Sequence, residues 1–331
     1  MAQKTVFVIG SNAFSGAQFI DYLLEKTKYN IIGISRSTEK KEAFLPYKKR
    51  KSSRVQFQQL DLNKDISKIL ELADKHKPAY LVNFAAQSEV APSWKNPEHW
   101  YQTNVLSLVS FLNQLKDRTY VEKYVHASTP EVYGTMSGAI TEHTHYNPST
   151  PYAASKAAAD LFISMLVKNF NFPAVFTRVA NIYGSGQQLH KIIPRSVMYI
   201  KLGKKIPLHG GGQSVRAFIH ARDASDCVLK IMEKAKPGEI YHVSNSEFVL
   251  IRDLVQKICD KMGVDFNTAT EISGDRVGKD AVYTLESTKA QKELDWKPSV
   301  SLDTGINEVI HWVEEEFAVL KNEPLEYVHK E

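Results

Sequence analysis

Tyr152 and Lys156 stand four residues apart in the segment STPYAASKAAADLF. The segment is alanine-rich and predicts a helix, and residues at this spacing lie on one helix face. A lysine ammonium near a phenol favours the phenolate and lowers the phenol pKa from its usual value of about 10. The pair therefore predicts a general base for a substrate hydroxyl, although the same spacing is also common in helices without a catalytic role.

The stretch HASTPEVYG, residues 126–134, has the pattern of a strand that opens into an active site. It carries the hydroxyls of Ser128 and Thr129 and the carboxylate of Glu131, which is a candidate base for a proton on carbon. Pro130 between them has no ionisable group and restricts the backbone, so it holds Thr129 and Glu131 rigidly. A surface glutamate in an ordinary loop is the alternative interpretation.

The stretch VIGSNAFSG near the N-terminus places glycines between a predicted strand and a predicted helix. Such a turn lets the backbone approach a pyrophosphate and directs the helix N-terminus at it. Ala13 stands where dinucleotide folds usually have a middle glycine, and a tight turn without a ligand is the alternative. The turn residues that we assign to a cofactor are Gly10, Asn12, Ala13, Phe14 and Gly16.

The end of the second predicted strand bears on which nicotinamide dinucleotide is bound. An acidic residue there would bind the ribose 2′-hydroxyl of NAD, but this chain has Ser35, Arg36 and Ser37. Because a guanidinium matches phosphate geometry, these residues favour NADP, with NAD possible and a surface role for Arg36 as the alternative. Asp61 and Leu62, at the end of the third strand, are assigned to the adenine.

Short β-branched runs alternate with longer amphipathic stretches through the first half of the chain, which predicts an α/β fold with a doubly wound parallel sheet. The expected strands are 5–10, 30–36, 55–62, 80–86, 121–128 and 173–184, and the expected helices include 16–27 and 66–77. We expect a dinucleotide-binding Rossmann-type domain over 1–184, to which 210–235 returns. A smaller mixed α/β lobe for substrate is expected over 185–320, including a strand at 239–244, and the last residues are expected to form a loosely held tail.

The composition is that of an ordinary globular protein, with 43% hydrophobic and 24% charged residues and a net charge of +5. No apolar run approaches the length of a membrane span, no signal-peptide pattern is present, and the two cysteines lack metal-ligand spacing. We therefore expect a cytoplasmic protein with no metal and no membrane partner. The basic stretch 37–54 is interpreted as a solvated loop rather than a nucleic-acid surface, because no aromatic interleaving or known binding module accompanies it. Contact with a cofactor phosphate is the second use that we consider for it.

Seven motifs in order resemble the extended short-chain dehydrogenase/reductase family, and the resemblance covers nearly the whole chain. They are the glycine turn, NFAAQSEV (83–90), STPEVYG (128–134), PYAASK (151–156), TRVANIYG (177–184), GGGQSVRAFIHARDAS (210–225) and LDWKPSVSLDTGI (294–306). The resemblance implies a nucleotide-sugar substrate and a dimer built on helices, with the helix carrying Tyr152 as a candidate.

Site roles follow from the matching positions. Tyr152 and Lys156 match the family's catalytic pair, which also contacts the cofactor, and Thr129 matches its sugar-hydroxyl-binding position. Within NFAAQSEV we assign Ala85 to the cofactor and Gln87 to the substrate. The family's contacts to the substrate diphosphate and nucleotide fall on Asn181, Arg216 and Arg276.

Family members that remove water from a hexose generally have a glutamate at the position of Glu131. Oxidation at C4 acidifies the C5 hydrogen, the carboxylate removes it, the C6 hydroxyl departs, and the hydride returns to C6 to give a 4-keto-6-deoxy sugar. In the thymidine-diphosphate-glucose dehydratases an aspartate precedes this glutamate and protonates the leaving hydroxyl, where this chain has Pro130. The guanosine-diphosphate-mannose dehydratases also lack that acid.

The resemblance therefore predicts a nucleotide-sugar 4,6-dehydratase. A uronic-acid decarboxylase of the UDP-glucuronate type remains an alternative, as does a 4-epimerase or a ketosugar reductase. A different class of protein is an NADP-sensing binding protein, against which the intact Tyr152–Lys156 pair argues.

Overall fold

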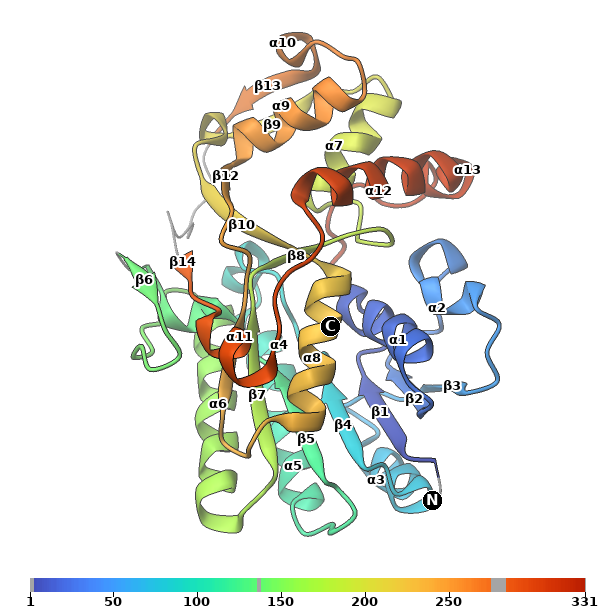
Figure 1. The fold of residues 1–331 in the computed structure, drawn as a ribbon, viewed down its shortest axis with the longest axis vertical. Helices are drawn as coiled ribbons and strands as arrows, with labels where there is room; N and C mark the ends of the chain where they lie inside the picture. Colours follow the sequence, from blue (N-terminus) through green and yellow to red (C-terminus); the bar gives the residue numbers. More distant parts are fainter. Residues whose placement is uncertain (1–2, 136–137, 275–283, 331) are drawn as a thin grey trace.

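The computed structural model describes residues 3–135, 138–274 and 284–330. Its centre is a seven-stranded parallel sheet in the order β11-β7-β5-β4-β1-β2-β3 (Figure 1). Its strands are β1 (Thr5–Ile9), β2 (Asn30–Ser35), β3 (Val55–Gln59), β4 (Tyr80–Asn83), β5 (Lys123–Ala127), β7 (Ala174–Val179) and β11 (Ile240–Val243). This order confirms the predicted doubly wound, Rossmann-type fold.

Helices cover both faces of this sheet, so its central strands are apolar on both sides. In β1, Val6 and Val8 belong to one hydrophobic cluster and Phe7 and Ile9 to another, as the two-residue period of a strand requires. Helices α1 (Phe14–Lys26), α8 (Ala221–Lys234) and α11 (Thr288–Leu294) contribute to the first cluster. The second contains residues of α3 (Ile66–His76), α5 (Leu108–Leu115) and α6 (Pro151–Phe170).

The chain also forms short helical segments between its longer elements. They are η1 (Glu42–Phe44), α2 (Pro46–Lys49), η2 (Ala91–Trp94), α4 (Pro97–Tyr101), the π-helical η3 (Gln102–Ser107), η4 (Pro130–Tyr133) and η5 (Gly210–Gly212).

Two strands differ from the sequence expectation. The run 173–184 is not one strand, because the chain leaves the main sheet at Ala180 and continues as β8 (Asn181–Tyr183). Strand β8 lies in a separate three-stranded sheet with β10 (Val215–His220) and β12 (Phe248–Leu250). Strand β11, expected in the second lobe, instead pairs in parallel with β7 at the edge of the main sheet.

The remaining elements lie mostly at the carboxyl ends of the main strands, at the top of Figure 1. The helices there are α7 (Ile192–Lys201), α9 (Ile251–Lys261), α10 (Phe266–Ala269), α12 (Leu302–Glu315) and α13 (Phe317–Leu320). Two-stranded sheets are formed by β9 (Ile206–His209) with β13 (Thr270–Ser273), and by β6 (Ala139–Ile140) with β14 (Thr284–Leu285). A division into domains at residue 184, with a return at 210–235, stays a prediction.

The C-terminal segment after α13 is packed against the protein, which corrects the expectation of a loosely held tail. Glu323 forms an ion pair with Lys41 at 2.6 Å, and Glu326 accepts a hydrogen bond of 2.9 Å from the hydroxyl of Tyr199. Among the residues described, no helix combines the length and apolarity that crossing a bilayer demands.

Candidate active site

The strands that follow β1 in the chain, β2 and β3, lie on one side of it, whereas β5 and β7, which follow β4, lie on the other side of β4. The strand order therefore reverses between β1 and β4, and a crevice forms there. Residues that follow these two strands, Gly10 and Ala85, meet at the carboxyl end of the sheet. Ligands of open α/β sheets bind at such a reversal of strand order.

The glycines of the first turn are required by close backbone approaches. Gly10 has a φ of +88°, and a Cβ there would lie 2.6 Å from the backbone nitrogen of Ala85. A Cβ on Gly16 would lie 2.3 Å from the carbonyl oxygen of Gly10. Neither position accepts a side chain without displacing backbone, so the turn is shaped to keep α1 and the end of β4 close together.

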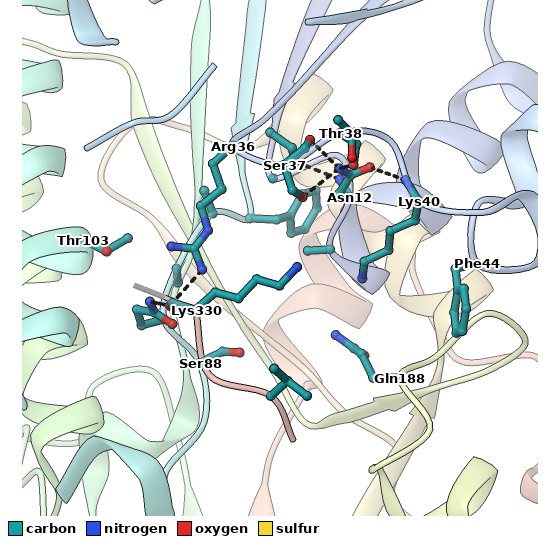
Figure 2. Close-up of a pocket in the computed structure, with 18 of the residues that line it drawn as sticks. Asn12, Arg36, Ser37, Thr38, Lys40, Phe44, Ser88, Thr103, Gln188 and Lys330 are labelled. Atoms are coloured by element: carbon teal, nitrogen blue, oxygen red, sulfur yellow. Dashed lines mark hydrogen bonds between the residues drawn. The ribbon is translucent and has the colours of Figure 1, made fainter. Parts of the chain in front are cut away.

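A cavity of about 570 Å³ opens over this turn (Figure 2). This volume lies within the range of small-molecule and cofactor sites. The predicted site residues that line the cavity are Gly10, Asn12, Ala13, Ser35, Arg36, Asp61, Leu62, Ala85 and Gln87. Phe14 and Gly16, in the first turn of α1, do not line it, and neither do the predicted cofactor contacts Tyr152 and Lys156 on α6. The residue types and the cradle fit a dinucleotide.

The polar groups at the rim of this cavity are already oriented by the protein. The hydroxyl of Ser35 accepts a 2.9 Å hydrogen bond from the backbone nitrogen of Asn12, and Asp61 accepts one of 2.8 Å from that of Asn63. Arg36 and Gln87 donate to the same carbonyl oxygen, that of Lys330, at 3.1 and 2.6 Å. The C-terminal segment therefore forms part of the wall.

Thr129 and Glu131 lie where β5 passes into the short helix η4. Thr129 is the N-cap, and its hydroxyl accepts a 3.3 Å hydrogen bond from the backbone nitrogen of Glu131. Pro130 occupies the first helical position, where its missing N–H costs nothing. Thr129 is buried and Glu131 is half-buried.

Tyr152 lies in the first turn of α6 and its side chain hydrogen-bonds with Thr129. Burial raises the pKa of the Tyr152 phenol, the bond with Thr129 lowers it, and the nearby Glu131 carboxylate raises it again. The expected lowering of this pKa is therefore not found, because the phenol is enclosed and the charge of Glu131 raises its pKa. Helix η4, which carries Glu131, packs against α6, which carries Tyr152.

Lys156 lies one turn further along α6 and is buried. Its ammonium donates to the carbonyl oxygen of Ala127 at 2.8 Å and contacts Nε2 of His126 at 3.1 Å. Burial lowers the pKa of Lys156 to about 8. Burial also lowers the pKa of His126 well below its usual value, so the imidazole is neutral and accepts the bond.

A buried ion pair fixes α6 against the sheet below this site. Asp160 and Arg178 are both fully buried and are joined at 2.8 Å. Asp160 also accepts a 2.6 Å hydrogen bond from Ser128, whereas Arg178 donates to the hydroxyls of Tyr133 and Tyr146. The hydroxyl of Ser128 therefore has a structural partner, and the neighbouring Thr129 is the one that reaches Tyr152.

Asn181 and Arg216 lie on the neighbouring strands β8 and β10. Asn181 is paired with Phe218, two residues from Arg216, so the two side chains lie on the same face of this small sheet. Both are half-buried, and neither lines the cavity over the glycine turn. Arg276 lies outside the described residues.

Sequence reasoning missed Asn104, which joins the cavity to the catalytic helix. Its side-chain amide donates to Ser155 on α6 and to the carbonyl oxygen of Gln87, both at 3.0 Å, and its oxygen accepts from the nitrogen of Gln87 at 2.8 Å. An asparagine in an apolar helical segment, NVLSLVSFL, is the one signal in the sequence.

Glu89 was also missed, and it lines the cavity. It accepts hydrogen bonds from Lys191 at 2.6 Å and from His190 at 3.2 Å. Burial raises the pKa of Glu89, but the bond from His190 and the charge of Lys191 outweigh it and lower the pKa to about 2. Glu89 is therefore ionised at neutral pH. In the part of the chain that is described, His, Cys, Asp and Glu side chains do not gather in threes that could hold a metal ion.

Comparisons with known proteins agree with this geometry. The family model described as GDP-mannose 4,6 dehydratase matches residues 7–309. The dTDP-D-glucose 4,6-dehydratase of Homo sapiens is 32% identical over 260 residues, which cover 76% of this chain and 73% of the relative.

Solved structures are also similar. The dTDP-glucose 4,6-dehydratase DesIV of Streptomyces venezuelae, solved with NAD bound, has a TM-score of 0.88 at 29% identity and covers 95% of this chain and 98% of its own. A dTDP-glucose 4,6-dehydratase of Bacillus anthracis, also in complex with NAD, has a TM-score of 0.87 at 28% identity and covers 96% and 99%.

The expected resemblance, enzyme class and reaction class are thereby confirmed at the level of the family. The glycine cradle, the cavity above it and the Tyr152–Lys156 helix beside it occur in a chain that matches these enzymes over nearly its full length. The chain belongs to the GDP-mannose 4,6-dehydratase family of nicotinamide-dependent nucleotide-sugar dehydratases.

Proposed function

We propose that the protein converts a nucleotide hexose into its 4-keto-6-deoxy form, with Thr129, Glu131, Tyr152 and Lys156 as the catalytic residues. The observation that carries this proposal is the packing of η4, with Thr129 as its N-cap and Glu131 within it, against α6, which carries Tyr152. The charge of Glu131 raises the pKa of the Tyr152 phenol, and a bond with Thr129 lowers it. A plain C4 epimerisation has no use for a carboxylate here, whereas removal of the C5 hydrogen requires a base.

Each catalytic residue of the chain has a separate role. Tyr152 takes the proton of the C4 hydroxyl, and Thr129 holds that hydroxyl. When bound, a nicotinamide dinucleotide would supply hydride transfer from C4 and later to C6, and the positive charge of its oxidised ring would favour the phenolate that burial alone disfavours. Lys156, held by Ala127 and His126, supplies a further positive charge at the same place.

Glu131 performs the elimination. Its carboxylate removes the C5 proton, the C5–C6 double bond forms, and the C6–O bond breaks. Pro130 has no proton to give, so Glu131 itself hands the proton that it has taken to the departing oxygen, which leaves as water. A proton from solvent then reaches C5 as hydride reaches C6, Tyr152 releases to solvent the proton that it took from the C4 hydroxyl, and the overall change is the loss of one water.

NAD is the better candidate for the resident dinucleotide, because the two similar structures were solved with NAD. This shifts the preference from NADP, which rested on Arg36. In the structure the guanidinium of Arg36 donates to the carbonyl of Lys330. Replacing Arg36 with alanine tests the choice. Equal changes in the affinities for NAD and NADP exclude a role in binding a 2′-phosphate, whereas a selective loss of NADP affinity restores it.

Asn181, Gln87 and Arg216 remain the candidates for substrate binding. The first and third share one face of the β8–β10 sheet, and a guanidinium and an amide are donors that suit a diphosphate.

A homodimer through the outer face of α6 is supported by apolar exposure. Leu161 and Met165 are one turn apart on α6 and are 58% and 54% exposed, and Leu106 on the adjoining η3 is 60% exposed. Large apolar side chains gathered on neighbouring helices are typical of an interface. Sedimentation should show a dimer that Leu161→Glu converts to monomer, and a monomeric unaltered protein contradicts this.

Both cysteines are buried free thiols, which supports a cytoplasmic location.

The function is tested by incubating the protein with GDP-mannose, dTDP-glucose, UDP-glucose, CDP-glucose and UDP-glucuronate and measuring product masses. We expect one of the four hexose nucleotides to lose water. Loss of carbon dioxide from UDP-glucuronate identifies a decarboxylase. A product of unchanged mass identifies an epimerase, and failure to turn over any substrate supports a binding protein.

A further inference from the structure

The C-terminal segment Lys321–Lys330 runs back from α13 across the dinucleotide cavity. Residues far from it in the sequence hold it. Lys41, in the loop after β2, pairs with Glu323, and Tyr199 of α7 bonds with Glu326. Its residues Glu323, Pro324, Glu326, Tyr327, Val328 and Lys330 line the cavity together with the glycine turn.

The last part of this segment is fixed by aromatic rings and by backbone bonds. The ring of His329 is stacked on the buried Trp100, with centroids 5.3 Å apart and planes at 5°. Its Nε2 lies 2.8 Å from Nδ1 of His99. The carbonyl oxygen of the next residue, Lys330, accepts hydrogen bonds from Arg36 and Gln87. These two bonds and the stacking of the preceding His329 fix the position of its backbone.

The side chain of Lys330 meets a second lysine inside the cavity. Figure 2 shows Lys330 and Lys40 entering the centre of the cavity from opposite walls. Burial, and after it the charge of Lys330, lowers the pKa of Lys40. Among the described residues, no carboxylate forms an ion pair with either lysine. The nearby acids are engaged elsewhere, Glu39 with Lys48, Glu89 with Lys191 and Glu323 with Lys41.

The charge of Glu323 raises the pKa of Lys40 but does not outweigh burial and the charge of Lys330. A ligand that supplies further negative charge therefore stabilises two cations that face each other. Both lysines line the same cavity as Asn12 and Ala13 of the glycine turn, where a dinucleotide places its pyrophosphate. Arg36 lies at the end of β2, on the side of the adenine ribose. We propose that the C-terminal segment is a wall of the dinucleotide site and that Lys330, with Lys40, neutralises the pyrophosphate.

This inference rests on the proposed use of a nicotinamide dinucleotide, but its test measures binding alone. Affinities for NAD and NADP are measured by calorimetry on full-length protein freed of bound nucleotide. Lys330→Gln removes the charge, and Lys321→Gln is the matched control, because Lys321 belongs to the same segment, is exposed and does not line the cavity.

We expect Lys330→Gln to weaken NAD and NADP equally, by about tenfold, and Lys321→Gln to leave both affinities unchanged. An unchanged affinity for NAD in Lys330→Gln overturns the inference. A loss confined to NADP also overturns it, because Lys330 would then bind the 2′-phosphate rather than the pyrophosphate.

Hydrogen exchange gives a second readout that turnover does not influence. NAD should slow exchange of the backbone amides of 325–330 in the unaltered protein and in Lys321→Gln, and should slow it less in Lys330→Gln. Exchange in this segment that NAD leaves unchanged contradicts a wall role. A protein that passes both binding tests but dehydrates no sugar leaves this inference standing and refutes the proposed function.

Discussion

Single residues carry the distinction between dehydration and simpler redox chemistry. The motifs of the sequence contain Thr129, Glu131, Tyr152 and Lys156 in an informative order. In the structure η4, with Thr129 as its N-cap and Glu131 within it, packs against α6, which carries the other two. The electrostatics could not be anticipated, because spacing on a helix does not reveal burial. Lys156 was expected to lower the pKa of Tyr152, yet burial is the larger influence, and His126 and Ala127 hold the ammonium.

Replacing Glu131 with glutamine should lower kcat for water loss by about 10²- to 10⁴-fold, because the C5 proton loses its acceptor while the side chain keeps its size. KM should change little, since the amide still fills the same place. Steady-state kinetics on the preferred substrate measure both constants. Glu247→Gln, an exposed glutamate in a loop, is the control, and a Glu131→Gln enzyme as fast as this control removes Glu131 from the mechanism.

Individual elements explain why the site keeps its geometry. Helix α6 begins with Thr150 as N-cap, whose hydroxyl accepts from the nitrogen of Ala153 at 3.1 Å. The alanine pattern of this helix was visible in the sequence, but its anchor was not. Asp160 and Arg178 lie in separate elements and pair only when α6 packs on β7. The break between β7 and β8 was hidden for a similar reason, because no glycine or proline marks Ala180 and the partner strand β10 is distant in sequence.

Asp160→Asn should reduce the free energy of unfolding by about 3 to 5 kcal/mol, because it leaves the buried guanidinium of Arg178 without its charge partner. Asp117→Asn removes an acid whose side chain is 75% exposed and pairs with Lys116, so it should cost less than about 1 kcal/mol. Urea unfolding of both variants makes the comparison. Equal losses would show that the buried pair does not anchor α6.

At the scale of the whole molecule, the sequence predicted a sheet of parallel strands, because the alternation of strand-like and helix-like segments is a local property of the sequence. It did not predict that the end of the chain closes the cavity. The polar residues 321–331 have the composition of a solvated tail, and their contacts with Arg36 and Gln87 span more than two hundred residues of sequence. The basic stretch 37–54 was interpreted as a solvated loop, but part of it forms η1 and α2, and its Lys48, Lys49 and Arg50 pair with carboxylates.

Global stability should fall as the pH drops below about 6.5, the usual histidine pKa. Burial lowers the pKa of His126 well below that value and the pKa of His242 to about 3. The unfolded chain then binds protons that the folded chain does not, so each histidine contributes a loss of up to about 1.4 kcal/mol per pH unit, and none above about pH 7. Unfolding free energies between about pH 7.5 and 5 measure this. The slope should become shallower in a His126→Gln, His242→Gln double variant, and an unchanged slope would assign the acid sensitivity to other groups.

The most direct test of the catalytic account is the reaction of the preferred nucleotide hexose in deuterated water, followed by mass spectrometry and NMR of the sugar. Removal of the C5 proton by Glu131 predicts a product that has lost one water and carries solvent deuterium at C5, with the original C4 hydrogen now at C6. A product of unchanged mass, or a dehydrated product with its original hydrogen at C5, contradicts the account.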